Sequence, residues 1–448
     1  MTNTGLSWLG IIRLGLVQTS LGAIVILTTS TMNRVMVVEL ALPAMLPGAL
    51  VAFHYAIQML RPRFGYGSDV GGNTTVWIIG GMGVLALGGI LAACATALMA
   101  SQLGAGIALA VLAFLLVGIG VGASGTSLLI LLAKRVDKHR RAAAATIVWL
   151  MMISGFIVTA TLAGHFLDPF SYLRLIQVTT VVSVIAFIVT LIAVYKIENI
   201  NNLAADPEKE KPSFREALLD VWSEPKARRF TIFVFVSMLA YSAQDLILEP
   251  FAGLIFDYTP GESTKLAGVQ NGGLLLGMIM VAVIGTLLNH KRVGALRVWV
   301  IAGCVASSAA LTGLAIAGIV GPPWPLKSSV FALGFANGAF AVAAIASMME
   351  LAGSGRASRE GIRMGLWGAA QAIAFCLGGF IGTVAIDVTR YFLASTSIAY
   401  AIVFIAQGLL FLVAAYLAAG IEKEETTTKQ SPNPFDQSKF TTEVLSNE

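Results

Sequence analysis

Residues 74–133 read TTVWIIGGMGVLALGGILAACATALMASQLGAGIALAVLAFLLVGIGVGASGTSLLILLA, 60 consecutive positions without Asp, Glu, Lys or Arg. About 20 apolar residues are enough for a helix to cross the hydrocarbon core of a bilayer. The stretch is therefore long enough for two such helices. The segment Ser101-Gln102-Leu103-Gly104 near its middle is typical of a tight turn. We predict two membrane-spanning helices joined by a short hairpin.

The composition of the whole chain agrees with this prediction. Of 448 residues, 57% are hydrophobic and 12% are charged, whereas about a quarter of the residues in a soluble domain are charged. A soluble enzyme, a nucleic-acid-binding protein and a disordered scaffold are excluded on this ground. We expect membrane lipid to surround the protein, and we expect it to bind no nucleic acid.

Further apolar segments continue on both sides of this stretch. Dividing the chain at charge clusters and turn residues predicts twelve spans in all. Their limits are 12–33, 43–60, 75–99, 104–133, 142–165, 172–195, 229–250, 265–288, 295–318, 327–350, 362–385 and 394–419. The chain is thus predicted to be an all-α polytopic membrane protein.

The basic residues predict the orientation of these spans. Lys and Arg are enriched in cytoplasmic loops of membrane proteins. With the amino terminus inside, 24 of the 29 basic residues fall on the cytoplasmic side. The five on the other side are Arg34, Arg174, Lys265, Lys327 and Arg390. We therefore predict that both termini are cytoplasmic.

One long polar interval divides the spans six and six. It predicts an N-terminal six-helix bundle at 1–197, a cytoplasmic linker at 198–228, a C-terminal six-helix bundle at 229–420 and a disordered cytoplasmic tail at 421–448. Two pseudo-symmetric six-helix bundles around a midplane cavity resemble the major facilitator fold.

The segment after the second span also resembles that superfamily. Gly65, Asp69 and Gly72 match the G-x-x-x-D-x-x-G skeleton of the major facilitator loop between helices two and three. In that family the Asp pairs with the facing bundle and latches one conformation. The basic residues that usually follow are missing here, because Val70 and Asn73 stand at two of these positions. The resemblance therefore implies a weakened latch.

Longer stretches resemble one branch of the superfamily, the bacteriochlorophyll-delivery proteins of PucC/LhaA type. They are RLGLVQ at 13–18, NRVM at 33–36, FHY at 53–55, RPRFG at 61–65, QDLILEP at 244–250 and GIRMGLWG at 361–368. The resemblance covers about residues 8–420. It implies a role in assembling light-harvesting complexes in the bacterial inner (intracytoplasmic) membrane, with bacteriochlorophyll as cargo. It also implies antenna polypeptides and bacteriochlorophyll synthase as partners. These stretches do not distinguish the LH1 antenna from LH2.

Ionisable residues inside or at the edge of spans are costly and mark candidate functional positions. Arg34 and Glu39 lie near the non-cytoplasmic end of the first span, and Asp245 and Glu249 are four residues apart on the seventh. One hypothesis is that Arg34 pairs across the bundle interface with Asp245 or Glu249 and closes that side of the cavity. The alternative is that all four are wetted residues at helix ends.

A second group of candidate residues surrounds a histidine in the second span. A neutral imidazole can ligate the magnesium of a chlorin, and His54 is flanked by Phe53 and Tyr55 and followed by Gln58. We predict that these four residues, with Asn271 of the eighth span, line a pigment cavity in which His54 is the axial ligand. The alternative is a buried histidine that donates to a neighbouring carbonyl.

Glycines also gather on several spans, including Gly272, Gly273 and Gly277 on the eighth. Small residues permit close approach of helices in lipid. We interpret these faces as packing surfaces.

Motifs for catalysis are missing from the sequence. It contains no G-x-x-x-x-G-K-[ST] segment and no pair of Asp-rich motifs for a magnesium diphosphate, and its four His are scattered. We expect no enzyme activity, no catalytic residues and no resident metal. Two alternatives to a pigment-carrying assembly factor stay open. One is a secondary transporter that couples a small solute to protons through Asp245 or Glu249, and the other is a pigment-free scaffold that holds antenna polypeptides.

Overall fold

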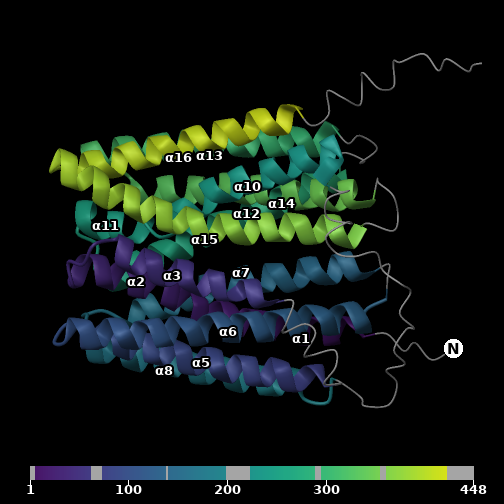
Figure 1. Ribbon diagram of the computed structural model, residues 1–448, viewed down its shortest axis with the longest axis horizontal. Coiled ribbons are helices and arrows are strands. Elements are labelled where there is room, and N and C mark those ends of the chain that lie inside the picture. The colour runs from purple at the N-terminus through teal and green to yellow at the C-terminus, as the bar shows by residue number, and fades with distance from the viewer. Residues whose placement is uncertain are drawn as a thin grey trace, which may run out of the picture.

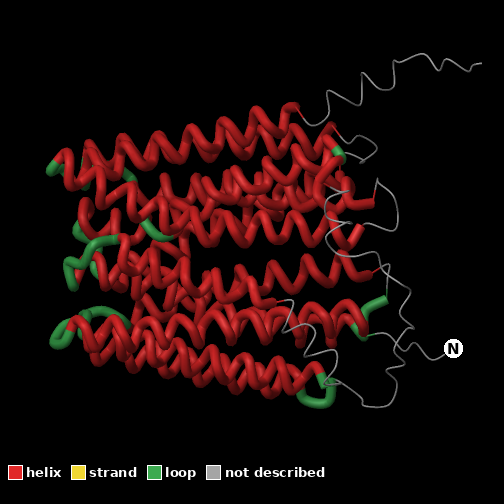
Figure 2. Tube along the Cα trace, viewed as in Figure 1, coloured by secondary structure: helices red, strands yellow, loops and turns green. Residues whose placement is uncertain are grey.

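The computed structural model describes residues 6–61, 73–137, 140–197, 222–287, 294–353 and 360–420. Every regular element within these ranges is helical (Figure 2). The N-terminal half contains α1 (Trp8–Ile26), η1 (Leu27–Thr31), α2 (Met32–Arg34), η2 (Val35–Glu39), α3 (Met45–Ile57), η3 (Gln58–Leu60), α5 (Thr74–Met99), α6 (Leu103–Arg135), α7 (Arg141–Phe166) and α8 (Tyr172–Val194). The C-terminal half contains α10 (Pro225–Asp245), α11 (Leu248–Phe256), α12 (Pro260–Leu287), α13 (Gly294–Val320), α14 (Leu326–Gly353), α15 (Glu360–Leu393) and α16 (Thr396–Gly420).

These helices confirm the twelve predicted spans. Within the described ranges, 11 helices are long and apolar enough to cross a membrane, and the shorter apolar helix Met45–Leu60 is the twelfth. Large hydrophobic side chains are exposed along the outer helices, among them Ile192 of α8 and Leu409 of α16. Such side chains face lipid in a membrane protein, because lipid tails are as apolar as they are.

The helices form two bundles that lie side by side (Figure 1). Each bundle has its own hydrophobic core, with Ile24 and Leu85 buried in the first and Phe340 and Phe404 in the second. Two helix pairs, α3 with α15 and α7 with α12, form the main contact between the bundles. In both pairs the second span of one half faces the fifth span of the other, so the interface follows the pseudo-symmetry of the halves.

The two ends of the molecule differ. One end carries the short connections 40–44, 100–102, 167–171, 257–259, 321–325 and 394–395, and we call it the loop end (left in Figure 1). The opposite end carries the start of α1 and the end of α16, and we call it the terminal end.

The seventh span is not the continuous helix that the sequence predicts. α10 ends at Asp245 and α11 begins at Leu248. Pro250 has no N–H, so the carbonyl of Leu246 lacks the donor that a helix would supply four residues later. The amide Nδ2 of Asn33, from the other bundle, donates to this carbonyl at 2.6 Å. The break in the helix is therefore stabilised from across the interface.

The first span also departs from prediction, because it continues as far as Glu39 and contains two π-helical turns, η1 and η2. Such turns are frequent at functional sites. Three predicted features lie outside the described residues: the loop motif of Gly65, Asp69 and Gly72, residues 198–221 of the linker, and the tail from residue 421 onward.

Candidate functional site

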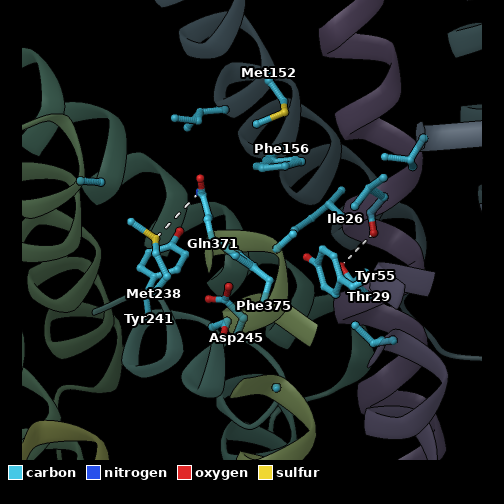
Figure 3. A pocket seen from close by; sticks show the side chains of 18 of the residues that line it. Ile26, Thr29, Tyr55, Met152, Phe156, Met238, Tyr241, Asp245, Gln371 and Phe375 are labelled. Carbon is cyan, nitrogen blue, oxygen red and sulfur yellow. Dashed lines mark hydrogen bonds between the residues drawn. The ribbon is translucent and has the colours of Figure 1, made fainter. Parts of the chain in front are cut away.

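A cavity of about 390 Å³ lies between the two bundles, at the level of the helix midpoints. Pockets for small molecules typically measure about 300–1,000 Å³. Residues of both bundles line it, including Thr29, Tyr55, Met152 and Phe156 on one side and Met238, Tyr241, Asp245, Gln371 and Phe375 on the other (Figure 3). Its wall is mainly apolar and aromatic, and both bundles also contribute polar side chains to it.

The N-terminal wall brings together several of the predicted site residues. Tyr55 and Gln58 line the cavity, and Arg61 lies beside them and donates to the Oε1 of Gln58. The ring of Tyr55 reaches toward the other bundle, with its centroid 5.6 Å from that of Phe375. Phe53 packs against the hydrophobic core of its own bundle and is not part of the cavity wall.

His54 touches the cavity but is almost completely buried, with 1% of its surface exposed. Its Nδ1 lies 2.7 Å from the carbonyl oxygen of Val51. Its ring lies 4.1 Å from the ring of Tyr55 and 6.5 Å from that of Phe114 in α6. The imidazole is therefore buried inside the N-terminal bundle, between two aromatic rings and next to a backbone carbonyl. This position agrees with the alternative given above, a buried histidine beside a neighbouring carbonyl.

The C-terminal wall carries a carboxylate. Asp245 ends α10 and points into the cavity near Tyr241 and Phe375 (Figure 3). Its carboxylate is hydrogen-bonded to the side chain of Gln270. Asn271 also lines the cavity, as predicted from the sequence, and its Nδ2 donates to the carbonyl of Ala267 at 2.9 Å.

Polar side chains join the bundles between the cavity and the loop end. Ser30 donates to Oε1 of the buried Glu249, and the hydroxyls of Thr31 and Thr264 are 3.0 Å apart. Buried polar groups are favourable only when they are hydrogen-bonded. These contacts therefore hold the first span against the seventh and the eighth and close the cavity on this side.

Arg34 lies in the predicted region but has a different partner. Among the described residues, no ion pair joins Arg34 to Asp245 or Glu249. Arg34 instead pairs with Glu39 on its own span. Arg34 also donates to the carbonyl oxygen of Tyr258 in the other bundle. The π-helical turn η2 begins directly after Arg34 and ends at Glu39, and the two side chains meet alongside it. Arg34 thus links the two bundles through its hydrogen bond to the carbonyl oxygen of Tyr258.

Two aspartates that sequence reasoning missed complete the closure of the loop end. Asp387 of α15 accepts hydrogen bonds from the backbone N–H groups of Ala44 and Met45, at 3.0 and 2.7 Å, where α3 begins. Asp168 accepts from the Thr259 hydroxyl at 2.8 Å and the Gly261 N–H at 3.1 Å, where α12 begins. Each carboxylate caps the amino terminus of a helix in the opposite bundle.

A wider hollow of about 650 Å³ lies at the loop end beyond these contacts. Its wall includes Arg34, Glu39, Asp168 and Tyr258. Burial, together with the nearby carboxylate of Glu262, raises the pKa of the Tyr258 hydroxyl. In the part of the chain that the structure describes, no group of three or more His, Cys, Asp or Glu side chains is arranged to hold a metal ion.

This arrangement can hold an amphiphilic ligand between the bundles. Apolar and aromatic side chains make up most of the wall, and Asp245, Gln58 and Arg61 offer polar contacts at separate points. Hydrogen bonds between the bundles close the loop end. The cavity therefore lies between this closure and the terminal end.

Comparison with known proteins gives close relatives over nearly the whole chain. A protein from Rhodobacter capsulatus named "Bacteriochlorophyll synthase 44.5 kDa chain" is 54% identical over 416 residues, which are 93% of this chain and 96% of that protein. Proteins named "Protein PucC" from Rhodovulum sulfidophilum and Cereibacter sphaeroides are 27% and 28% identical, over 85% and 81% of this chain and 85% and 80% of their own.

Solved structures with a similar fold include transporters. A bacterial homologue of the lysosomal transporter Spinster, in an inward-facing and unoccupied conformation, has a TM-score of 0.70 at 14% identity and covers 95% of this chain and 98% of its own. The nucleoside transporter NupG has a TM-score of 0.67 at 14% identity, with 92% and 99% covered. These similarities show the major facilitator fold.

The profile of the family described as "PUCC protein" matches residues 31–426. This match covers all but the first thirty residues and residues 427–448, and it confirms the resemblance seen in the sequence. The chain belongs to the PUCC protein family.

Proposed function

We propose that this protein is an assembly factor for bacterial light-harvesting complexes that holds bacteriochlorophyll in its central cavity and hands it over within the membrane. Membership of the PUCC protein family supports the proposal. So does the name of the 54% identical relative, which refers to bacteriochlorophyll.

The observation that carries the proposal is the chemistry of the cavity. A wall that is mainly apolar and aromatic, with polar side chains from both bundles, suits a flat ligand that has an apolar body and polar edges. The volume of about 390 Å³ is near the lower end of the range for small-molecule pockets. A pigment therefore places its ring system in the cavity while its hydrocarbon tail extends outside it.

The proposed role is not catalytic. The word "synthase" belongs to the name of the relative, and the sequence lacks the motifs that a pigment-synthesising prenyltransferase or a nucleotide-driven pump requires. Bacteriochlorophyll synthase is, in this proposal, a separate partner that loads the cavity. Antenna polypeptides are the partners that receive the pigment.

The proposed location is the bacterial inner membrane, including its intracytoplasmic extensions, with both termini in the cytoplasm. The distribution of basic residues supports this orientation, because 24 of 29 fall on the side of the termini. In that orientation the loop end faces away from the cytoplasm and the central cavity lies on the cytoplasmic side of the closure.

A proton-coupled transporter is the second candidate, because Asp245 lines the cavity and Glu249 lies at the closure. Carboxylates at such positions can carry protons in secondary transporters. A pigment-free scaffold remains the third.

The near-infrared absorption spectrum of protein purified from its native membrane in mild detergent distinguishes the three. Co-purifying bacteriochlorophyll in a fixed ratio to protein is the expected result. A colourless protein that takes up a solute with protons after reconstitution would overturn the proposal in favour of transport. A colourless protein that co-purifies with antenna polypeptides would overturn pigment binding in favour of a scaffold.

A further inference from the structure

We propose that Asp245 is the residue that anchors the ligand in the central cavity, by binding its electropositive centre through the carboxylate. For the pigment of the proposed function this centre is the magnesium ion of the macrocycle. The inference rests on the proposed function and assigns the axial ligand to Asp245 instead of His54.

The position of Asp245 differs from that of the neighbouring acidic residue on the same span. Asp245 lines the cavity and points into it (Figure 3). Glu249, four residues later, lies in the closure of the loop end and accepts a hydrogen bond from Ser30. Of these two carboxylates, only that of Asp245 is open to a ligand in the cavity.

The ionised form of Asp245 also needs a cation or hydrogen-bond donors to compensate its charge. A carboxylate inside the membrane region is costly unless a cation or hydrogen-bond donors compensate it. Arg34 pairs with Glu39 and Arg140 with Asp137, and among the described residues no ion pair of Asp245 is found. The side chain of Gln270 supplies one hydrogen bond, which fixes the carboxylate without neutralising it. Protonation relieves this cost in the empty cavity, and a ligand with an electropositive centre relieves it when one is bound.

Magnesium matches this group. Carboxylate oxygens are hard ligands of the kind that Mg²⁺ prefers. A macrocycle that already holds magnesium in its plane leaves an axial position for one such oxygen. Asp245 is therefore chemically suited to that axial position.

The surroundings of Asp245 suit a flat ring system. Tyr241 and Phe375 lie beside it on the C-terminal wall, with ring centroids 5.9 Å apart. Tyr55 faces Phe375 from the other bundle at 5.6 Å. These three rings offer apolar faces against which a macrocycle can pack while its metal reaches the carboxylate.

His54 is less suited to the same role. Only 1% of its surface is exposed, and its ring is enclosed by Tyr55 and Phe114. A macrocycle cannot approach the imidazole closely without displacing Tyr55. The geometry thus favours Asp245 as the group that reaches a bound pigment.

The test compares two probes on full-length protein in mild detergent: bacteriochlorophyll a, and bacteriopheophytin a, in which two protons replace the magnesium. Dissociation constants for both are measured by fluorescence titration. We expect the wild type to bind the magnesium pigment about tenfold or more tightly than the metal-free one. Asp245→Leu should abolish this preference, and Asp245→His should keep it, because imidazole also ligates magnesium.

Glu249→Gln is the matched control, because it neutralises an acidic residue on the same span outside the cavity wall; its preference should equal that of the wild type. Asp245→Asn, which keeps the size of the side chain, replaces Asp245→Leu if the leucine variant does not fold, and it should reduce the preference. A preference that stays at the wild-type value in Asp245→Leu or Asp245→Asn, or that is lost in His54→Leu, would overturn the assignment to Asp245 alone. A wild type that binds both pigments equally would do the same. A wild type that binds neither pigment would overturn the proposed function.

Discussion

Asp168 and Asp387 make the same kind of contact from opposite halves of the protein. Asp168 follows the fifth span and caps the start of the eighth, whereas Asp387 lies near the end of the eleventh and caps the start of the second. The two contacts are related by the pseudo-symmetry of the bundles. Together they place a carboxylate on each side of the interface at the loop end, at the positive ends of two helix dipoles.

We expect Asp168→Ala and Asp387→Ala each to weaken the closure of the loop end. Loss of a capping carboxylate costs about 1–2 kcal/mol, so the ratio of open to closed molecules at this end should rise about tenfold. Spin labels at Ser101→Cys and Ser328→Cys, two exposed positions on opposite bundles, report the change as longer distances. The labels require replacement of the native Cys94, Cys304 and Cys376.

Asp137→Ala is the control for these variants, because it removes a carboxylate that pairs with Arg140 at the terminal end. It should leave the distances at the loop end unchanged. Unchanged distances in both Asp168→Ala and Asp387→Ala would show that the caps do not stabilise the closed state.

The contact between Asn33 and the break in the seventh span gives a second prediction. Asn33→Ala should destabilise the protein by about 1–3 kcal/mol, because the buried carbonyl of Leu246 then has no donor. Adding Pro250→Ala should recover part of this loss, since residue 250 then has an N–H that can reach the same carbonyl. Thermal unfolding in detergent measures both effects. A double variant no more stable than Asn33→Ala would contradict this explanation of the break.

The partner of Arg34 can be measured by a double-mutant cycle. We expect Arg34→Met and Glu39→Gln to show a coupling energy of about 1 kcal/mol, limited by the 32% exposure of the Glu39 side chain. The cycle of Arg34→Met with Glu249→Gln should give a smaller value. A larger coupling with Glu249 would restore the pairing predicted from the sequence.

Two glycines on α12 allow a matched test of close helix packing. A Cβ atom on Gly277 would overlap the carbonyl oxygen of Phe335 in α14, whereas one on Gly272 would meet nothing within 4 Å. Gly277→Ala should therefore lower stability by about 1–3 kcal/mol. Gly272→Ala should leave it unchanged or raise it slightly, because alanine favours the helix. Equal melting temperatures for the two variants would exclude close packing as the role of Gly277.

Much of the architecture could be predicted from the sequence, because membrane-spanning helices are marked by local hydropathy. The stretch 74–133 became α5 and α6 with a turn at residues 100–102, as predicted. The interruption of the seventh span was missed, although Pro250 marks it, because a proline in a membrane helix is tolerated when another group satisfies the free carbonyl. That group is Asn33, in a different bundle.

The candidate site was predictable in part. His54, Gln58, Tyr55, Asn271 and Asp245 do lie around one cavity, but their roles stay predictions. Ionisable residues inside spans are conspicuous in a chain with so few charges, and this made Arg34, Glu39 and Glu249 visible in the sequence. Asp168 and Asp387 were overlooked because they lie at or near helix ends, where an acidic residue is unremarkable.

The sequence by itself determined that the chain crosses a membrane twelve times in two halves, because apolar length and the distribution of basic residues act locally and need no knowledge of contacts. Only the tertiary structure decided which polar groups meet. Arg34 donates to the carbonyl oxygen of Tyr258 in the other bundle, and Asp387 reaches the start of α3. These contacts depend on how two bundles, far apart in sequence, pack against each other, and on the requirement that each buried polar group find a partner.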